Sequence, residues 1–157
     1  MKKEHPSVMQ MWRNYLESIG EGVEDTKKKY SSWHFEITEE SANNLVKLVM
    51  KGEKKATAAS LWVEEYDYGT IPKEGDHSII TNWDGIAKCI IKTTKINIVP
   101  YKEVTEEFAK KEGEGDHSLN YWRNVHRTYY SKECKRIGRR FTEDMPVICE
   151  EFEVVYK

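Results

Sequence analysis

Apolar residues recur at helical spacing in several stretches of the chain, which predicts the positions of its helices. The first stretch predicts a helix over residues 6–19, with Pro6 in its first turn and Gly20 after its end. A second helix is predicted to begin after Thr38, whose side chain would cap it, and to end at Gly52. The predicted buried stripe of this second helix consists of Ala42, Leu45, Leu48 and Val49.

Two more helices are predicted in the second half of the chain. A short one near residues 104–111 would end before Gly113 and Gly115, which break the pattern. Ser118 is predicted to cap a longer helix. The inward-facing residues of that longer helix are predicted to be Leu119, Trp122, Val125, His126 and Tyr129.

Alternation of apolar and polar residues predicts strands between these helices. Trp33, Phe35 and Ile37 alternate with polar neighbours, and "ASLWVEEY" (59–66) is also interpreted as a strand. Two further strands would meet at the Asp84-Gly85 turn, the second of them running over residues 86–99.

The closing segment "PVICEEFEVVY" alternates again and predicts the last strand. Five or six strands, mostly joined as hairpins and interleaved with helices, favour the α+β class with a small mixed β-barrel. We expect residues 1–30 to form an N-terminal helix and connection packed on the barrel, and residues 31–157 to form the main domain.

Composition restricts the class of protein. The chain has 157 residues, of which 38% are hydrophobic and 33% charged, as in a globular protein with a well-solvated surface. No apolar run is long enough to span a bilayer, and no signal peptide is predicted. The three cysteines lack a CxxC spacing, which favours free thiols and a cytoplasmic location. The five histidines lack HExxH-type spacing, so we expect neither a metal nor a cofactor.

Charge is distributed unevenly, although the net charge is only −2. Residues 117–140 contain seven cations and a single acid, Glu133. Such a basic stripe is typical of a solvated helix face but is also what an RNA-binding surface needs. The seven cations are Arg123, Arg127, Lys132, Lys135, Arg136, Arg139 and Arg140.

One short stretch resembles a known family. "GEKKATAASLW" fits the glycine-x-lysine-x-x-threonine signature of ASCH domains, and "EGDHSIITNWDGIAKCIIKTTKI" and "EGEGDHSLNYWRNVHRTYYSKE" are similar to the longer bacterial branch of that family. The resemblance runs from about Trp33 to the C-terminus. It implies a PUA-like barrel with a cleft, lined by the lysine-containing turn, for a nucleoside, nucleotide or RNA.

Some short bacterial members of the family are amidohydrolases that act on N(4)-acetylcytidine. Carried onto this chain, that resemblance implies Lys54, Thr57 and Glu112 as the catalytic residues. The chain departs from those enzymes in being longer and in having Ala58 and Ala59 after the threonine.

This set is chemically suited to amide hydrolysis without a metal. A hydroxyl on Thr57 could act as nucleophile, Lys54 as a base if desolvation lowers its pKa, and Glu112 as the proton donor to the departing amine. Each residue also has an ordinary structural explanation: a helix-end cation, a turn-forming threonine and a surface acid.

Two alternatives stay open beside hydrolysis. The first is a non-catalytic RNA-binding module that uses the basic stripe and exposed aromatic residues. The second is a metal-independent ribonuclease that combines Lys54 with Tyr66 or Tyr68. The predicted ligand-binding residues around the cleft are Ser60, Trp62, Trp83, Asp116, Ser118 and Arg123.

Overall fold

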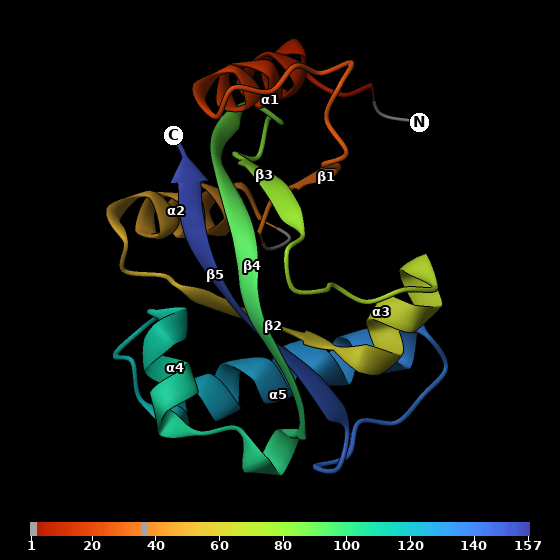
Figure 1. Cartoon of the computed structure of the whole chain (residues 1–157). Coiled ribbons are helices and arrows are strands. Elements are labelled where there is room, and N and C mark those ends of the chain that lie inside the picture. The colour runs from red at the N-terminus through yellow and green to blue at the C-terminus, as the bar shows by residue number, and fades with distance from the viewer. Residues whose placement is uncertain (1–2, 36–37) are drawn as a thin grey trace. The chain divides into compact units, whose positions relative to one another are not determined.

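A computed structural model of the protein describes residues 3–35 and 38–157. These residues fold into two compact units, each made of several segments of the chain. The first unit comprises residues 1–52, 75–92 and 153–157, and the second comprises residues 53–74 and 93–152. Figure 1 labels the helices and strands of both units.

The first unit is built on helices α1 (Pro6–Ser18) and α2 (Glu39–Lys51) and strands β1 (Tyr30–Trp33) and β3 (His77–Thr81). It also holds the first half of strand β4 (Ala87–Pro100). The apolar side of α1 packs against β3 and β4. The buried residues of this core are Val8, Trp12, Tyr15, Leu16, Ile79 and Ile90.

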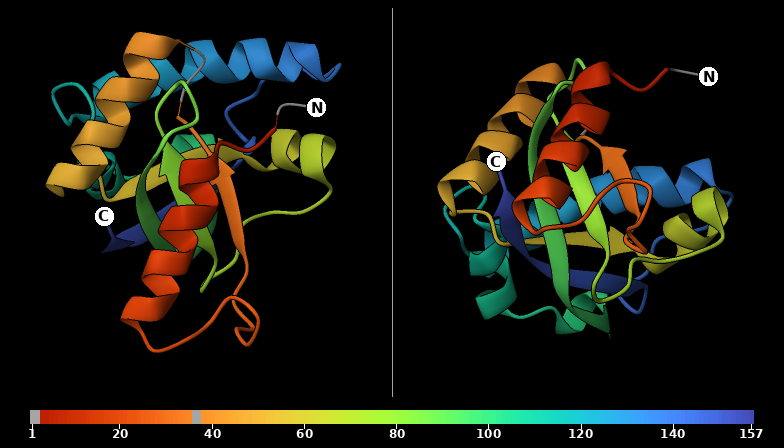
Figure 2. Two further views of the ribbon diagram at one scale, coloured as in Figure 1. Left: turned by 90° about the horizontal axis from the view of Figure 1, so that it is seen from above. Right: turned by 45° about the horizontal axis from the view of Figure 1, so that its top comes forward.

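The second unit contains strand β2 (Ala56–Ser60), the second half of β4 and most of strand β5 (Pro146–Tyr156). Figure 2 shows the long helix of this unit, α5, from two sides. Its helical elements are α3 (Leu61–Tyr68), the 3₁₀ turn η1 (Tyr101–Glu103), α4 (Glu106–Glu112) and α5 (Leu119–Arg136).

The core of the second unit lies between its strands and the inner sides of α4 and α5. Its buried residues are Ala56, Tyr101, Val104, Phe108, Ala109, Trp122, Tyr130, Cys134, Met145, Val147 and Cys149.

The strands form one five-stranded sheet in the order β1-β3-β4-β5-β2. Strand β1 pairs in parallel with β3, whereas β3 with β4 and β2 with β5 are antiparallel. Because β1 and β2 stand at opposite ends of this order and do not pair with each other in the described chain, the sheet is open. The α+β class and the N-terminal helix are confirmed, but the sheet does not close into the predicted small mixed β-barrel.

The helices and the hairpin that were predicted from caps and turn residues are found where they were predicted. Thr38, Thr105 and Ser118 each cap a helix by accepting a hydrogen bond from a backbone N–H three residues later. Gly85 has a positive φ of 83° in the predicted turn, where β3 and β4 form an antiparallel hairpin. The closing strand is also where alternation predicted it.

The strand predicted at "ASLWVEEY" is wrong in its second half. Strand β2 ends at Ser60, whose hydroxyl accepts a hydrogen bond from the backbone N–H of Val63 and so caps α3. Gly69 then ends the helix in the left-handed conformation. A serine followed by an acid four residues later outweighed the β propensity of the Leu-Trp-Val run.

Smaller differences concern two other elements. The first predicted strand is Tyr30–Trp33, so Phe35 lies beyond it, and Ile37 lies outside the described residues. In α2 the buried stripe is Ala42, Leu45, Val46 and Val49, so Val46 takes the place predicted for Leu48, which is only half-buried.

The largest difference concerns the orientation of α5. Trp122 is buried as predicted, but Val125 and Tyr129 are 39% and 37% exposed and lie on the outer side. The predicted division of the chain at residue 30 stays a prediction.

Candidate functional site

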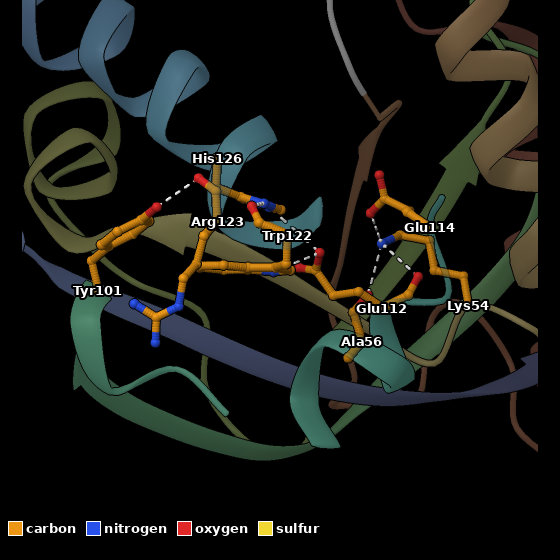
Figure 3. Close-up of polar contacts among 8 residues, drawn as sticks. All are labelled: Lys54, Ala56, Tyr101, Glu112, Glu114, Trp122, Arg123 and His126. Atoms are coloured by element: carbon orange, nitrogen blue, oxygen red, sulfur yellow. Dashed lines mark hydrogen bonds and ion pairs between the residues drawn. The ribbon is translucent and has the colours of Figure 1, made fainter. Parts of the chain in front are cut away.

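Lys54 of the signature lies two residues before β2 and is buried, with only 2% of its surface exposed. Its ammonium donates hydrogen bonds to the Glu114 carboxylate and the Ala56 carbonyl, both at 2.8 Å, and to the Glu112 carbonyl at 3.4 Å. Figure 3 shows the three acceptors gathered around the nitrogen. The lysine is therefore a buried cation held in an ion pair, not a solvated helix-end charge.

Backbone contacts bring Lys54 to the end of α4. The backbone N–H of Lys55 donates to the Lys111 carbonyl at 2.7 Å. Gly113, which ends α4 with a φ of +68°, lies so close to this segment that a Cβ there would be 2.3 Å from the Glu53 carbonyl oxygen. A glycine is thus required at the point where the two segments meet.

Glu112, the last residue of α4, turns its carboxyl group into the interior and is 2% exposed. Its Oε2 accepts a hydrogen bond from the Trp122 indole N–H at 3.0 Å and lies 3.4 Å from Nε2 of His126. Burial raises the pKa of Glu112 to about 8, against the opposing effect of the Lys54 charge. The carboxyl group therefore carries a proton at neutral pH.

His126 completes the buried cluster from the next turn of α5. Its ring stacks on Trp122 with centroids 4.0 Å apart, and its Nδ1 lies 2.8 Å from the Trp122 carbonyl. Because a carbonyl only accepts, Nδ1 carries the hydrogen and Nε2 is an acceptor facing Glu112. Burial lowers the pKa of His126 to about 4. The contact with Glu112 therefore joins two neutral groups rather than an ion pair.

The arrangement resolves into one charged pair and one neutral pair. Lys54 and Glu114 carry opposite charges, while Glu112 and His126 are neutral near pH 7. A neutral carboxylic acid of this kind can donate a proton. We name Lys54, Glu112, Glu114 and His126 the buried cluster. Within residues 3–35 and 38–157, no group of three or more His, Cys, Asp or Glu side chains could hold a metal ion.

Thr57 lies elsewhere on β2. It is paired in register with Glu150 of β5, so the two side chains share a face of the sheet. Ala56 and Ala58, on the opposite face, pack in the core of the second unit. Glu150 accepts a hydrogen bond of 2.5 Å from the Thr93 hydroxyl. The structure thus brings Lys54 and Glu112 together and places Thr57 opposite Glu150.

Two predicted ligand residues next to the signature, Ser60 and Trp62, have structural roles at the start of α3. Ser60 is 3% exposed, caps α3 and donates to the Met145 sulfur at 3.2 Å. Trp62 is half-buried against the core, and the Arg139 guanidinium covers its ring at 4.4 Å. On the same helix, Tyr66 and Tyr68 are 66% and 71% exposed.

The other predicted ligand residues have structural partners. Hydrogen bonds from the Ser118 hydroxyl and then from its backbone N–H lower the pKa of Asp116, and Ser118 caps α5. Trp83, in the first unit, donates its backbone N–H to the Asn43 side chain. Arg123 donates to the carbonyls of Lys102 and Val104 at 2.8 and 3.3 Å.

The cations of the basic stripe fall into two groups. Arg123 bonds carbonyls, Arg127 pairs with Glu143, and Arg136 pairs with Asp67 and Glu133. The remaining four cations are exposed and make no ion pair with any described residue. We name these four the basic segment: Lys132, Lys135, Arg139 and Arg140.

Sequence reasoning missed two members of the buried cluster. Glu114 follows Glu112 by two residues across a glycine, and His126 follows Trp122 by one helical turn. The second spacing was visible as part of the inward-facing stripe of α5, but it does not distinguish a core histidine from one that contacts a carboxyl group.

The mixed α+β fold and the glycine-x-lysine-x-x-threonine signature, which supplies the buried Lys54, both point to the class of ASCH domains. The family model described as "ASCH domain" matches residues 31–156. The chain belongs to this family, which confirms the resemblance seen in the sequence.

Two solved structures are similar over nearly the whole chain. An ASCH domain from Lactobacillus crispatus JV V101 is 34% identical, covers 100% of this chain and 99% of its own, and has a TM-score of 0.91. The protein EF3133 from Enterococcus faecalis V583 is 32% identical over 96% of this chain and 88% of its own, with a TM-score of 0.84.

A more distant structure shares the fold alone. The hypothetical protein PH0355 is 22% identical, covers 80% of this chain and 96% of its own, and has a TM-score of 0.51. A search of curated proteins finds no similar sequence. In the part of the chain that the structure describes, no helix has the length and apolar character needed to cross a membrane.

Proposed function

We propose that this ASCH protein binds RNA through the outer side of α5 and the basic segment. One observation supports the proposal above the others: α5 carries five cations and a single acid, Glu133, in a protein whose net charge is −2. Glu133 itself is paired with Arg136. Lys132, Lys135 and Arg140 are exposed, and Arg139 is exposed although its guanidinium lies over the Trp62 ring. These four charges can meet phosphate groups, which dominate affinity for nucleic acid.

Neutralising the basic segment tests this proposal. We expect the Lys132→Gln/Lys135→Gln/Arg139→Gln/Arg140→Gln variant to bind a fluorescein-labelled 12-nucleotide RNA more weakly than wild type, as measured by anisotropy. The plot of log affinity against log salt should become shallower by about 0.7 for each cation that contacts a phosphate.

A matched control removes the same charge elsewhere. Four exposed lysines outside α5, namely Lys47, Lys51, Lys95 and Lys110, are changed to glutamine together. This control should keep a salt dependence close to that of wild type. Equal losses in the two variants, or no RNA binding by wild type at moderate salt, would rule out the proposal.

A second candidate function is hydrolysis of N(4)-acetylcytidine, supported by the meeting of Lys54 and Glu112 in the buried cluster. In this proposal Lys54 stabilises the carbonyl oxygen and Glu112 passes its proton to the departing amine. Because Thr57 lies on the other face of β2, opposite Glu150, water would attack the carbonyl carbon directly and pass a proton to Nε2 of His126, releasing acetate.

Acetate release from N(4)-acetylcytidine measures this activity. We expect Glu112→Gln, which keeps the shape of the side chain but cannot give up a proton, to lose the activity at least about 100-fold. Thr57→Val, a change on the other face of β2, should keep the rate. A wild-type rate no higher than that of Glu112→Gln would exclude hydrolysis. It would not affect the proposal that the protein binds RNA.

A further inference from the structure

We propose that unpaired RNA bases stack on Tyr121 and Tyr129, so that the ligand of the α5 surface is single-stranded RNA. The inference rests on the proposed RNA-binding function and goes further by naming the part of the nucleic acid that is recognised. It starts from an unusual distribution of apolar side chains along α5.

Three large apolar residues lie in one line on the outer side of α5. Tyr121, Val125 and Tyr129 are spaced four residues apart, which places them on successive turns of the same side. They are 39%, 39% and 37% exposed, while Trp122 and Tyr130 are buried on the inner side. A continuous apolar line on the outer, exposed side of a helix marks an interaction surface.

The charge on this side of the helix indicates the chemistry of the occupant. Glu133 comes next at the four-residue spacing, but its carboxylate is paired with Arg136, and Lys132 beside it is exposed. An apolar line that ends beside an exposed cation is complementary to a chain with flat apolar bases and anionic phosphates. The two tyrosines are about 12 Å apart along the helix axis, since eight residues each add 1.5 Å.

The first of these rings is held in place before any ligand arrives. Gly115, with a φ of +59°, lies so close to Tyr121 that a Cβ on it would be 2.4 Å from the ring. The ring is thus packed against the preceding loop and remains 39% exposed. Fixing a side chain in advance reduces the entropy that binding must overcome.

Base stacking on aromatic rings requires bases that are not paired within a helix. In duplex RNA the base faces are covered by their neighbours, and proteins recognise shape, phosphates and 2′-hydroxyls instead. On single strands every base has a face that tyrosine can cover, and the contact tolerates sequence differences. The α5 surface therefore predicts a preference for single strands with little sequence specificity.

The test compares a labelled 12-nucleotide single-stranded RNA with a blunt duplex of the same length, by anisotropy. Wild type is expected to bind the single strand more tightly than the duplex. Tyr121→Ala/Tyr129→Ala should weaken single-strand binding at least about 5-fold, and Tyr121→Phe/Tyr129→Phe should keep it, because phenylalanine still stacks.

Tyr66 and Tyr68 provide the matched control. They are more exposed than the α5 tyrosines but lie on α3 among Glu64, Glu65 and Asp67. Tyr66→Ala/Tyr68→Ala should bind as wild type does. Thermal unfolding of every variant establishes that the fold is retained.

The possible results separate the two proposals. If wild type binds RNA but the alanine variant of α5 binds equally well, or binds duplex and single strand alike, stacking is wrong and RNA binding stands. If wild type binds no RNA, both the RNA-binding proposal and the stacking proposal are wrong. If the alanine variant loses self-association rather than RNA affinity, the surface belongs to a protein partner and the inference is overturned.

Discussion

Replacing Lys54 with methionine should lower the free energy of unfolding at pH 7 by about 3–5 kcal/mol. The side chain is 1% exposed, and its ammonium is the ion-pair partner of Glu114. Methionine fills a similar volume but leaves the Glu114 carboxylate and the Ala56 carbonyl without their donor. Urea denaturation followed by circular dichroism measures the loss.

Lys55→Met is the control for this substitution. Lys55 is the next residue, but its side chain is exposed. Its replacement should change the free energy of unfolding by no more than about 0.5 kcal/mol. If both variants are equally stable, Lys54 does not hold a buried ion pair in solution.

The second prediction concerns the pH dependence of stability, which Glu112 and His126 control together. The ordinary pKa of glutamate is 4.5 and that of histidine is 6.5, and the fold shifts them in opposite directions, to about 8 and about 4. Between pH 4.5 and 6.5 folding adds one proton to Glu112 and removes one from His126. The two contributions cancel over that range, and stability is unaffected by this pair.

Between pH 6.5 and 8, Glu112 is the member of this pair that changes the free energy of unfolding. The folded protein binds its proton and the unfolded chain does not, so the free energy of unfolding falls as pH rises, by about 1.4 kcal/mol per pH unit. Over this window the loss is about 2 kcal/mol. In Glu112→Gln the amide has no proton to release, and this loss should be absent.

Urea denaturation of wild type and Glu112→Gln at pH 6.5, 7.25 and 8 measures the difference directly, because all other titrating groups are common to both proteins. The stability of the variant relative to wild type should rise steadily across the series. A constant difference would mean that Glu112 is already ionised at pH 6.5 in the folded protein.

Local chemistry made much of this fold predictable. Helix caps at Thr38 and Ser118 and the Asp84-Gly85 turn act over a few residues, so the sequence contains all that determines them. The open sheet was not predictable in this way. It depends on which distant strands pair, and no residue of β1 or β2 signals that these two strands remain edges.

The candidate site was predictable only in part. The meeting of Lys54 with Glu112 was implied by family resemblance, since 58 residues separate them and no spacing rule connects them. The orientation of α5 was mispredicted for a physical reason. Its outer side carries Val125 and Tyr129, so hydrophobic periodicity gives two overlapping stripes, of which only one packs in the core.

Helix α5 connects the buried cluster with the proposed RNA surface. Its inner side holds Glu112 through Trp122 and His126, while its outer side presents Tyr121 and Tyr129. The buried cluster therefore fixes the helix against α4. Substitutions in the cluster are expected to change stability, and substitutions on the outer side to change affinity.

Titration of ¹⁵N-labelled protein with an unlabelled 12-nucleotide single-stranded RNA tests the central claim most directly, because it shows which backbone amides meet the ligand. We expect the amide signals of residues 119–136, with those of Arg139 and Arg140, to shift as RNA is added, while the signals of α1 stay in place. Shifts concentrated in α1 or α2, or none at all at millimolar RNA, would contradict RNA binding by α5.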